Sequence, residues 1–96
     1  MLKVDVEKLS DTAVLYFQGH IVVGAETATL RKAVFSHPDA RILILDFSRV
    51  DLIDAAGLGV LVELRAWTQM RGIKLRLENP KRRVQDLFAL TCLDSV

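Results

Sequence analysis

The strongest constraint on the fold is a mostly apolar stretch in the middle of the chain, residues 41–47, with the sequence Arg-Ile-Leu-Ile-Leu-Asp-Phe. Its β-branched residues and its lack of alternation are typical of a central strand covered on both faces. Sheets built from such strands are joined by helices. Leu30, Ala33 and Val34 recur at helical spacing before this stretch, and Pro38 ends that helix. The centre of the chain therefore predicts alternating helices and strands.

The remaining segments predict a single α/β domain over residues 1–96. Residues 2–7 alternate between apolar and polar side chains, and the short connection to the more apolar residues 13–17 favours an antiparallel hairpin. Later strands alternate with helices, which predicts right-handed crossovers and parallel pairing in a mixed sheet. The predicted order is strand 2–7, strand 13–17, helix 26–35, strand 41–47, helix 55–71, strand 73–77 and a final helix that begins at Pro80.

Short local signals set the expected boundaries of these elements. Aspartate and asparagine are strong helix N-caps, proline is favoured at the first helical position, and glycine often follows a helix end. The expected boundaries are Gly19 closing the second strand, residues 48–53 as a loop, Asp54 as an N-cap, Gly72 as a helix stop, and Asn79 as an N-cap ahead of Pro80.

Charge and composition exclude several classes of function. Thirteen basic and twelve acidic residues nearly cancel, so no net field draws the protein to nucleic acid or to an anionic membrane. No apolar run is long enough to span a bilayer, and the N-terminus lacks a signal-peptide pattern, which predicts a cytosolic protein. The single cysteine, Cys92, is expected to be a small buried hydrophobe. His20 and His37 lie in separate turns and are expected to be loop residues, not metal ligands.

The most informative segment runs from Ile44 to Leu61, where the predicted central strand leads through Asp-Ala-Ala-Gly-Leu-Gly into a helix. It resembles the Asp-Ser-Ser-Gly-Leu-Gly signature of the anti-sigma-factor antagonists, which are STAS domains. In that family a partner kinase phosphorylates the serine before the first glycine. Ala56 occupies the matching position, so the resemblance implies a non-catalytic binding module that cannot be phosphorylated there.

The resemblance also has a consequence for the end of the chain. Members of the family usually continue past the position of Leu93 into another strand and a final helix, so these two elements are expected to be missing here. The strand over residues 73–77 would then be left with an unpaired edge, which favours self-association.

The expected partner surface begins at the loop that enters the second helix, where free N–H groups and the helix dipole meet. Two apolar stripes run along this helix. Val60, Leu61, Leu64 and Trp67 form a stripe that suffices for the core, whereas Leu58, Val62, Ala66 and Met70 form a second stripe that is either enclosed or a partner surface. The candidate interface residues are Asp54, Ala55, Ala56, Gly57, Leu58 and Val62.

These features predict reversible binding to an anti-sigma factor or a kinase-like protein, with no cofactor. A scaffold or oligomerisation module, including a homodimer, is the alternative within the same fold. The rival from another class is a nucleotide-dependent phosphotransfer enzyme that uses Asp46, Asp51 and Asp54 around magnesium. That chemistry needs convergent carboxylates and a positioned lysine, and the spacing fixes neither. Gly57-Leu58-Gly59 also lacks the other residues of a phosphate-binding loop.

Overall fold

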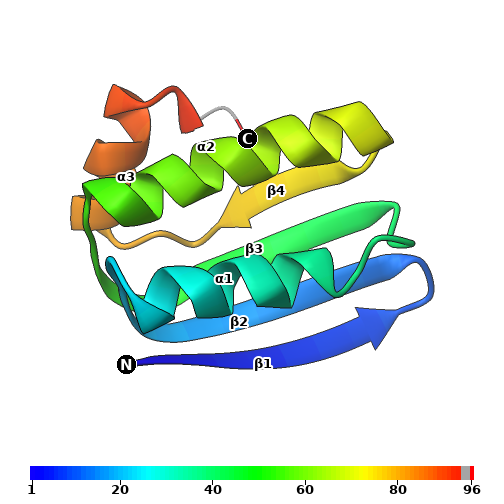
Figure 1. The fold of residues 1–96 in the computed structure, drawn as a ribbon, viewed down its shortest axis with the longest axis horizontal. Helices are drawn as coiled ribbons and strands as arrows, with labels where there is room; N and C mark the ends of the chain where they lie inside the picture. The colour runs from blue at the N-terminus through cyan, green and yellow to red at the C-terminus, as the bar shows by residue number, and fades with distance from the viewer. Residues whose placement is uncertain (94–95) are drawn as a thin grey trace.

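A computed structural model describes residues 1–93 and 96 of the chain. The described residues form one four-stranded sheet in the order β1-β2-β3-β4, with three helices (Figure 1). Strands β1 and β2 pair antiparallel, and the pairs β2–β3 and β3–β4 are parallel. The predicted mixed α/β fold is therefore confirmed. The elements are β1 Leu2–Leu9, β2 Thr12–Ile21, α1 Ala25–Phe35, β3 Ile42–Ile53, α2 Ala55–Arg71, β4 Lys74–Glu78 and α3 Arg82–Leu90.

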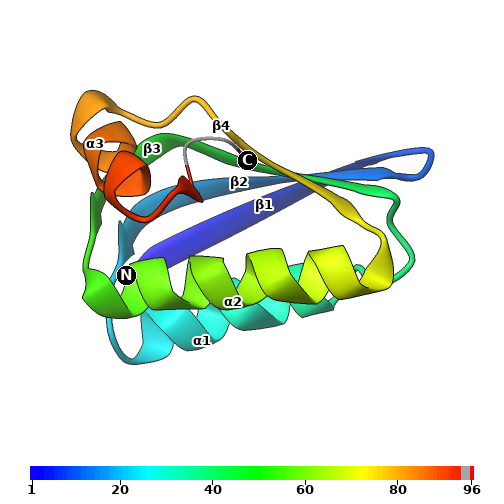
Figure 2. The same cartoon turned by 90° about the horizontal axis from the view of Figure 1, so that it is seen from above.

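The core lies between the sheet and the two longer helices. Figure 2 shows α1 and α2 together on one face of the sheet, and α3 near the end of the sheet where β3 passes into α2. Alternate residues of β2 and β3 point into this layer and are fully buried, among them Leu15 and Leu45. Phe47 stacks on Phe17 at 5.8 Å between ring centroids and meets Phe88 of α3 edge-on at 5.3 Å. This aromatic cluster ties the third helix to the central strand.

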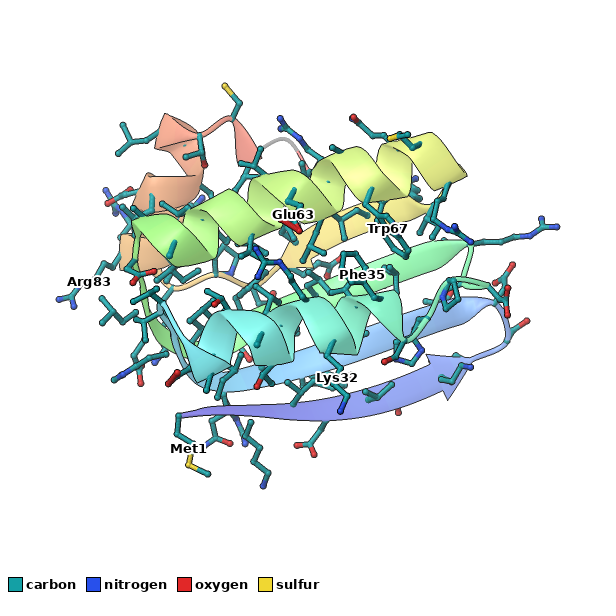
Figure 3. The ribbon with its side chains drawn as sticks, in the orientation of Figure 1. Met1, Lys32, Phe35, Glu63, Trp67 and Arg83 are labelled. Carbon is teal, nitrogen blue, oxygen red and sulfur yellow. The ribbon has the colours of Figure 1, made fainter. Side chains whose placement is uncertain are left out.

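The two long helices are joined to each other near the surface. Phe35 of α1 meets the Trp67 ring edge-on at 4.9 Å, and the Arg71 guanidinium lies over that ring (Figure 3). Arg31 donates two hydrogen bonds to Glu63, which also spans the two helices. Trp67 is partly buried and packs against the core, so its predicted core role is correct only in part.

Strand β1 continues to Leu9, beyond its predicted end, and β2 and β3 also extend further than the sequence predicted. Residues 48–53 belong to β3 and do not form a loop, and β2 continues past Gly19 to Ile21. The β2–β3 register shifts after Tyr16 and again after Gly19, so bulges allow the pairing to continue. At the first shift the Asp46 carboxylate accepts hydrogen bonds from the Ser48 N–H and hydroxyl, which supplies a local partner for the irregular backbone.

The start of α3 and the environment of the cysteine also differ from expectation. Asn79 has a φ of +56° and does not cap a helix, because its side-chain amide donates to Asp46 at 2.9 Å instead. Lys81 is the residue at the N-cap, and the helix begins at Arg82, two residues after Pro80. Cys92 is exposed and has a φ of +58° just after the C-cap of α3, so its predicted burial was wrong.

The prediction that β3 is covered on both faces is also wrong for the described residues. Ile42, Ile44 and Asp46 point away from α1 and α2, and each is only partly buried. Helices α1 and α2 lie on the opposite face of the sheet, so neither of them covers these positions (Figure 2). None of the helices in the described ranges is long and apolar enough to cross a membrane.

Candidate functional site

Asp54 joins the two loops at the end of the sheet where β2 and β3 finish. One carboxylate oxygen accepts the Gly57 N–H at 2.8 Å and caps α2, as predicted. The other accepts the Val23 N–H at 3.0 Å and holds the loop between β2 and α1. These backbone hydrogen bonds, from Gly57 first and then Val23, lower the pKa of Asp54 below its ordinary value. A single ionised side chain therefore fixes both loops beside each other.

Gly57 seats the first turn of α2 directly against the ends of two strands. It is buried, and a Cβ at this position would lie 3.0 Å from a methyl group of Ile21 and 3.0 Å from one of Ile53. The same Cβ would collide with the Ile21 carbonyl oxygen. The site therefore requires the smallest residue here for packing, independently of any partner.

The other candidate interface residues divide between contact with the protein and contact with solvent. Ala55 is exposed, and Ala56 and Leu58 are partly buried. Val62 is 38% exposed one turn further along α2. Farther along the same helix, Ala66 is exposed and Met70 is 88% exposed, so the second apolar stripe is open to solvent beyond Leu58. The enclosed alternative holds only for Leu58, which packs partly against the core.

Two apolar side chains beside this loop were missed by the sequence reasoning. Val23 is 71% exposed, and its N–H is bound by Asp54. Leu52 is 40% exposed at the end of β3, where it pairs in register with His20 of β2. The sequence places both apolar residues in segments expected to be connections between strands and helices, and that was the signal available. They extend the candidate surface to both sides of Asp54, so we define the loop surface as Val23, Leu52, Ala55, Ala56, Leu58 and Val62.

The three carboxylates of the phosphotransfer alternative do not converge. Burial raises the pKa of Asp46, but hydrogen bonds from Ser48 and Asn79 outweigh it and lower that pKa overall. Asp51 forms an ion pair with Lys81, whose hydrogen bond lowers the pKa of Asp51. Asp54 is occupied by backbone N–H groups. Within residues 1–93 and 96, no three His, Cys, Asp or Glu side chains are grouped as metal ligands.

Comparison with known families gives a direct assignment of the domain. The model of the STAS domain family matches residues 3–96. The chain therefore belongs to the STAS domain family, as the Asp54-to-Gly59 segment predicted.

Solved structures with this fold differ widely in length and in sequence. The phosphorylated form of the Bacillus cell fate determinant SpoIIAA is 16% identical, with a TM-score of 0.78 over 97% of this chain and 86% of that one. An anti-sigma factor antagonist from Mycobacterium paratuberculosis is 22% identical, with a TM-score of 0.73 over 99% and 81%. Mglu is 29% identical, with a TM-score of 0.73 over 81% of this chain, which spans only 20% of the Mglu chain.

Proposed function

We propose that this domain is a cytosolic, non-catalytic regulatory module that binds a protein partner reversibly through the loop surface. The observation that carries the proposal is a group of small and apolar side chains exposed around one well-fixed loop. Interfaces gain most of their affinity from such central apolar contacts when water is excluded from them. The hydrogen bonds of Asp54 hold the surface in one conformation before binding, which reduces the entropy lost on association.

The partner class is an anti-sigma factor or a kinase-like protein. Two proteins that share the fold are an anti-sigma factor antagonist from Mycobacterium paratuberculosis and SpoIIAA, whose structures include phosphorylated and unphosphorylated forms. Ala56 stands where the antagonist signature carries its phosphorylated serine, and alanine has no hydroxyl to accept a phosphoryl group. We therefore expect the loop surface to remain competent for binding in the presence of the partner kinase and ATP.

A scaffold or oligomerisation role is the second candidate, because the sheet face opposite α1 and α2 carries apolar side chains that no described helix covers. The phosphotransfer alternative lacks support, since its three carboxylates have separate partners. An assay of nucleotide hydrolysis and nucleotide binding separates it from both binding roles.

Intact-mass measurement after incubation with a kinase that modifies related domains tests the loss of the switch. We expect no phosphate between Asp54 and Gly57. A phosphate mapped inside that segment would contradict the proposal. Ser48 is exposed and Thr27 is buried and hydrogen-bonded to Gly24, so a switch moved elsewhere would fall on Ser48 before Thr27.

A further inference from the structure

The sheet face opposite α1 and α2 is ordered in rows by the strand register. One row runs across all four strands as Glu7, Val14, Ile44 and Arg76, because each of these residues is the register partner of the next. The next row is Leu9, Thr12, Ile42 and Lys74. We call these eight residues the open face. Its outer positions include an acid on β1 and two bases on β4, and its centre is mostly apolar.

The centre of the open face is more apolar than an exposed surface requires. Val14, Ile42 and Ile44 are only partly buried, and two of them come from β3, which turns apolar residues to this side as far as Ile44 and then Asp46. Natural sheets with one wet face alternate apolar and polar residues, and β3 does not do so over residues 42–45. Contiguous apolar side chains of this kind mark a contact surface.

The charges identify the occupant of this surface. Consider a two-fold axis that lies between two facing copies and runs parallel to the strands, midway between β2 and β3. It places β1 of one copy over β4 of the other, so that Glu7 faces Arg76 twice and Val14 faces Ile44 twice. Facing sheets pack about 10 Å apart with interdigitated side chains. We propose that the open face binds a second copy of this chain in this two-fold arrangement.

The neighbouring rows fix where the contact is centred. The row that contains Lys74 brings Leu9 over the aliphatic part of that lysine, which is compatible with contact. On the other side, Asp5 of one copy would face Glu78 of its partner, and these two acids repel each other. The Arg76 guanidinium holds Glu78 in its own chain at 3.1 Å, so it must turn from Glu78 to reach Glu7 of the second copy. The contact is therefore centred on the two rows of the open face.

The size of the open face sets the expected strength of the dimer. Four strands at about 4.8 Å spacing span only about 14 Å between the outer strand axes. Such an interface lies at the small end for specific complexes, so we expect a dimer that dissociates at micromolar concentrations. It would form independently of any partner on the loop surface, because the two surfaces use different residues.

Charge reversal at the two ends of the central row provides the test. Sedimentation velocity of the 96-residue chain, over a series of concentrations from micromolar to millimolar, is expected to show a monomer–dimer equilibrium. Glu7→Arg places like charges opposite each other twice in the dimer, and Arg76→Glu does the same. Each variant alone should dimerise about tenfold or more weakly than the parent.

Mixing the two variants is the decisive measurement. In a mixed dimer, Arg at position 7 of the first variant faces Glu at position 76 of the second, and the native Glu7 faces the native Arg76. An equimolar mixture should therefore recover the dimer that neither variant forms alone. Lys32→Glu is the matched control, because Lys32 projects from α1 on the helix-covered side of the sheet (Figure 3). Its dimerisation should equal that of the parent.

Three results would overturn the proposal. The parent could remain monomeric at the highest concentration. Alternatively, both reversal variants could dimerise with the same affinity as the parent, as they would if the dimer formed by pairing along the edge of β4. The mixture could also dimerise no better than the two separate variants. Circular dichroism melts of each variant confirm that a lost dimer reflects the interface and not the fold.

Discussion

Gly57→Ala and Gly59→Ala make a matched pair that tests how α2 is seated on the sheet. Both glycines lie in the same helix, and alanine favours a helix over glycine by about 1 kcal/mol. At Gly59 the added methyl group meets nothing within 4 Å. We therefore expect Gly59→Ala to raise the free energy of unfolding by about 0.5–1 kcal/mol.

The same substitution at Gly57 should have the opposite sign. Its methyl group would enter the space occupied by the Ile21 carbonyl oxygen and by two isoleucine methyl groups at 3.0 Å. That oxygen also accepts the Asp54 N–H, so it cannot move without disturbing the cap. Overpacking of this kind costs about 1–3 kcal/mol, which exceeds the gain in helix propensity.

Urea denaturation of the parent and both variants gives the comparison, and the thermal midpoint should fall by about 4–8 °C for each kcal/mol lost in a domain of this size. The slopes of the three denaturation curves should agree, which shows that only stability has changed. Equal stabilisation of Gly57→Ala and Gly59→Ala would refute the reasoning, because it would mean that the first turn of α2 is not packed against Ile21.

Three further predictions concern the core, the cap and the fixed loops. Phe47→Ala should cost about 3–5 kcal/mol by equilibrium unfolding because it leaves a cavity between Phe17 and Phe88, whereas Phe35→Ala, at a surface 39% exposed, should cost much less. Because the pKa of Asp54 is lowered in the folded state, its ionised carboxylate stabilises the fold above about pH 4, and this stability is lost as the pH falls through the lowered pKa. Asp54→Asn should therefore flatten the decline in stability at acid pH, measured by urea titrations. Asp54→Asn should also speed amide exchange at Val23, and unchanged exchange there would contradict the two-loop role.

Much of the fold could be predicted because its signals are local. The apolar residues of β3, the Asp54 cap and the Gly72 stop each act within a few positions, and Gly72 indeed adopts the left-handed conformation at the end of α2. The extension of β3 to Ile53 could not be predicted in this way, because it depends on pairing with β2 across two bulges. Asn79 was mistaken for a cap because its actual partner, Asp46, is distant in sequence.

The candidate site was predictable only in part, for the same reason. The motif residues from Asp54 to Leu58 are contiguous and follow a strand, so a sequence pattern finds them. Val23 comes beside them only because the second oxygen of Asp54 binds its N–H. Leu52 depends on the strand extension that the sequence did not reveal. The exposure of Val62 depends on which face of α2 meets α1 and the sheet, and the contacts with α1 fall on Glu63 and Trp67. Periodicity alone leaves that choice open.

Titration calorimetry of purified anti-sigma factors against the parent and Ala56→Asp tests the central claim most directly. Position 56 lies in the first turn of α2, where an acidic side chain is favourable to the helix dipole, so the fold should change by less than about 1 kcal/mol. Desolvating that charge within an interface costs about 2–5 kcal/mol, and binding should fall more than tenfold. Lys32→Asp, away from the loop surface, should bind like the parent. If Ala56→Asp binds a partner as tightly as the parent does, the loop surface is not the interface.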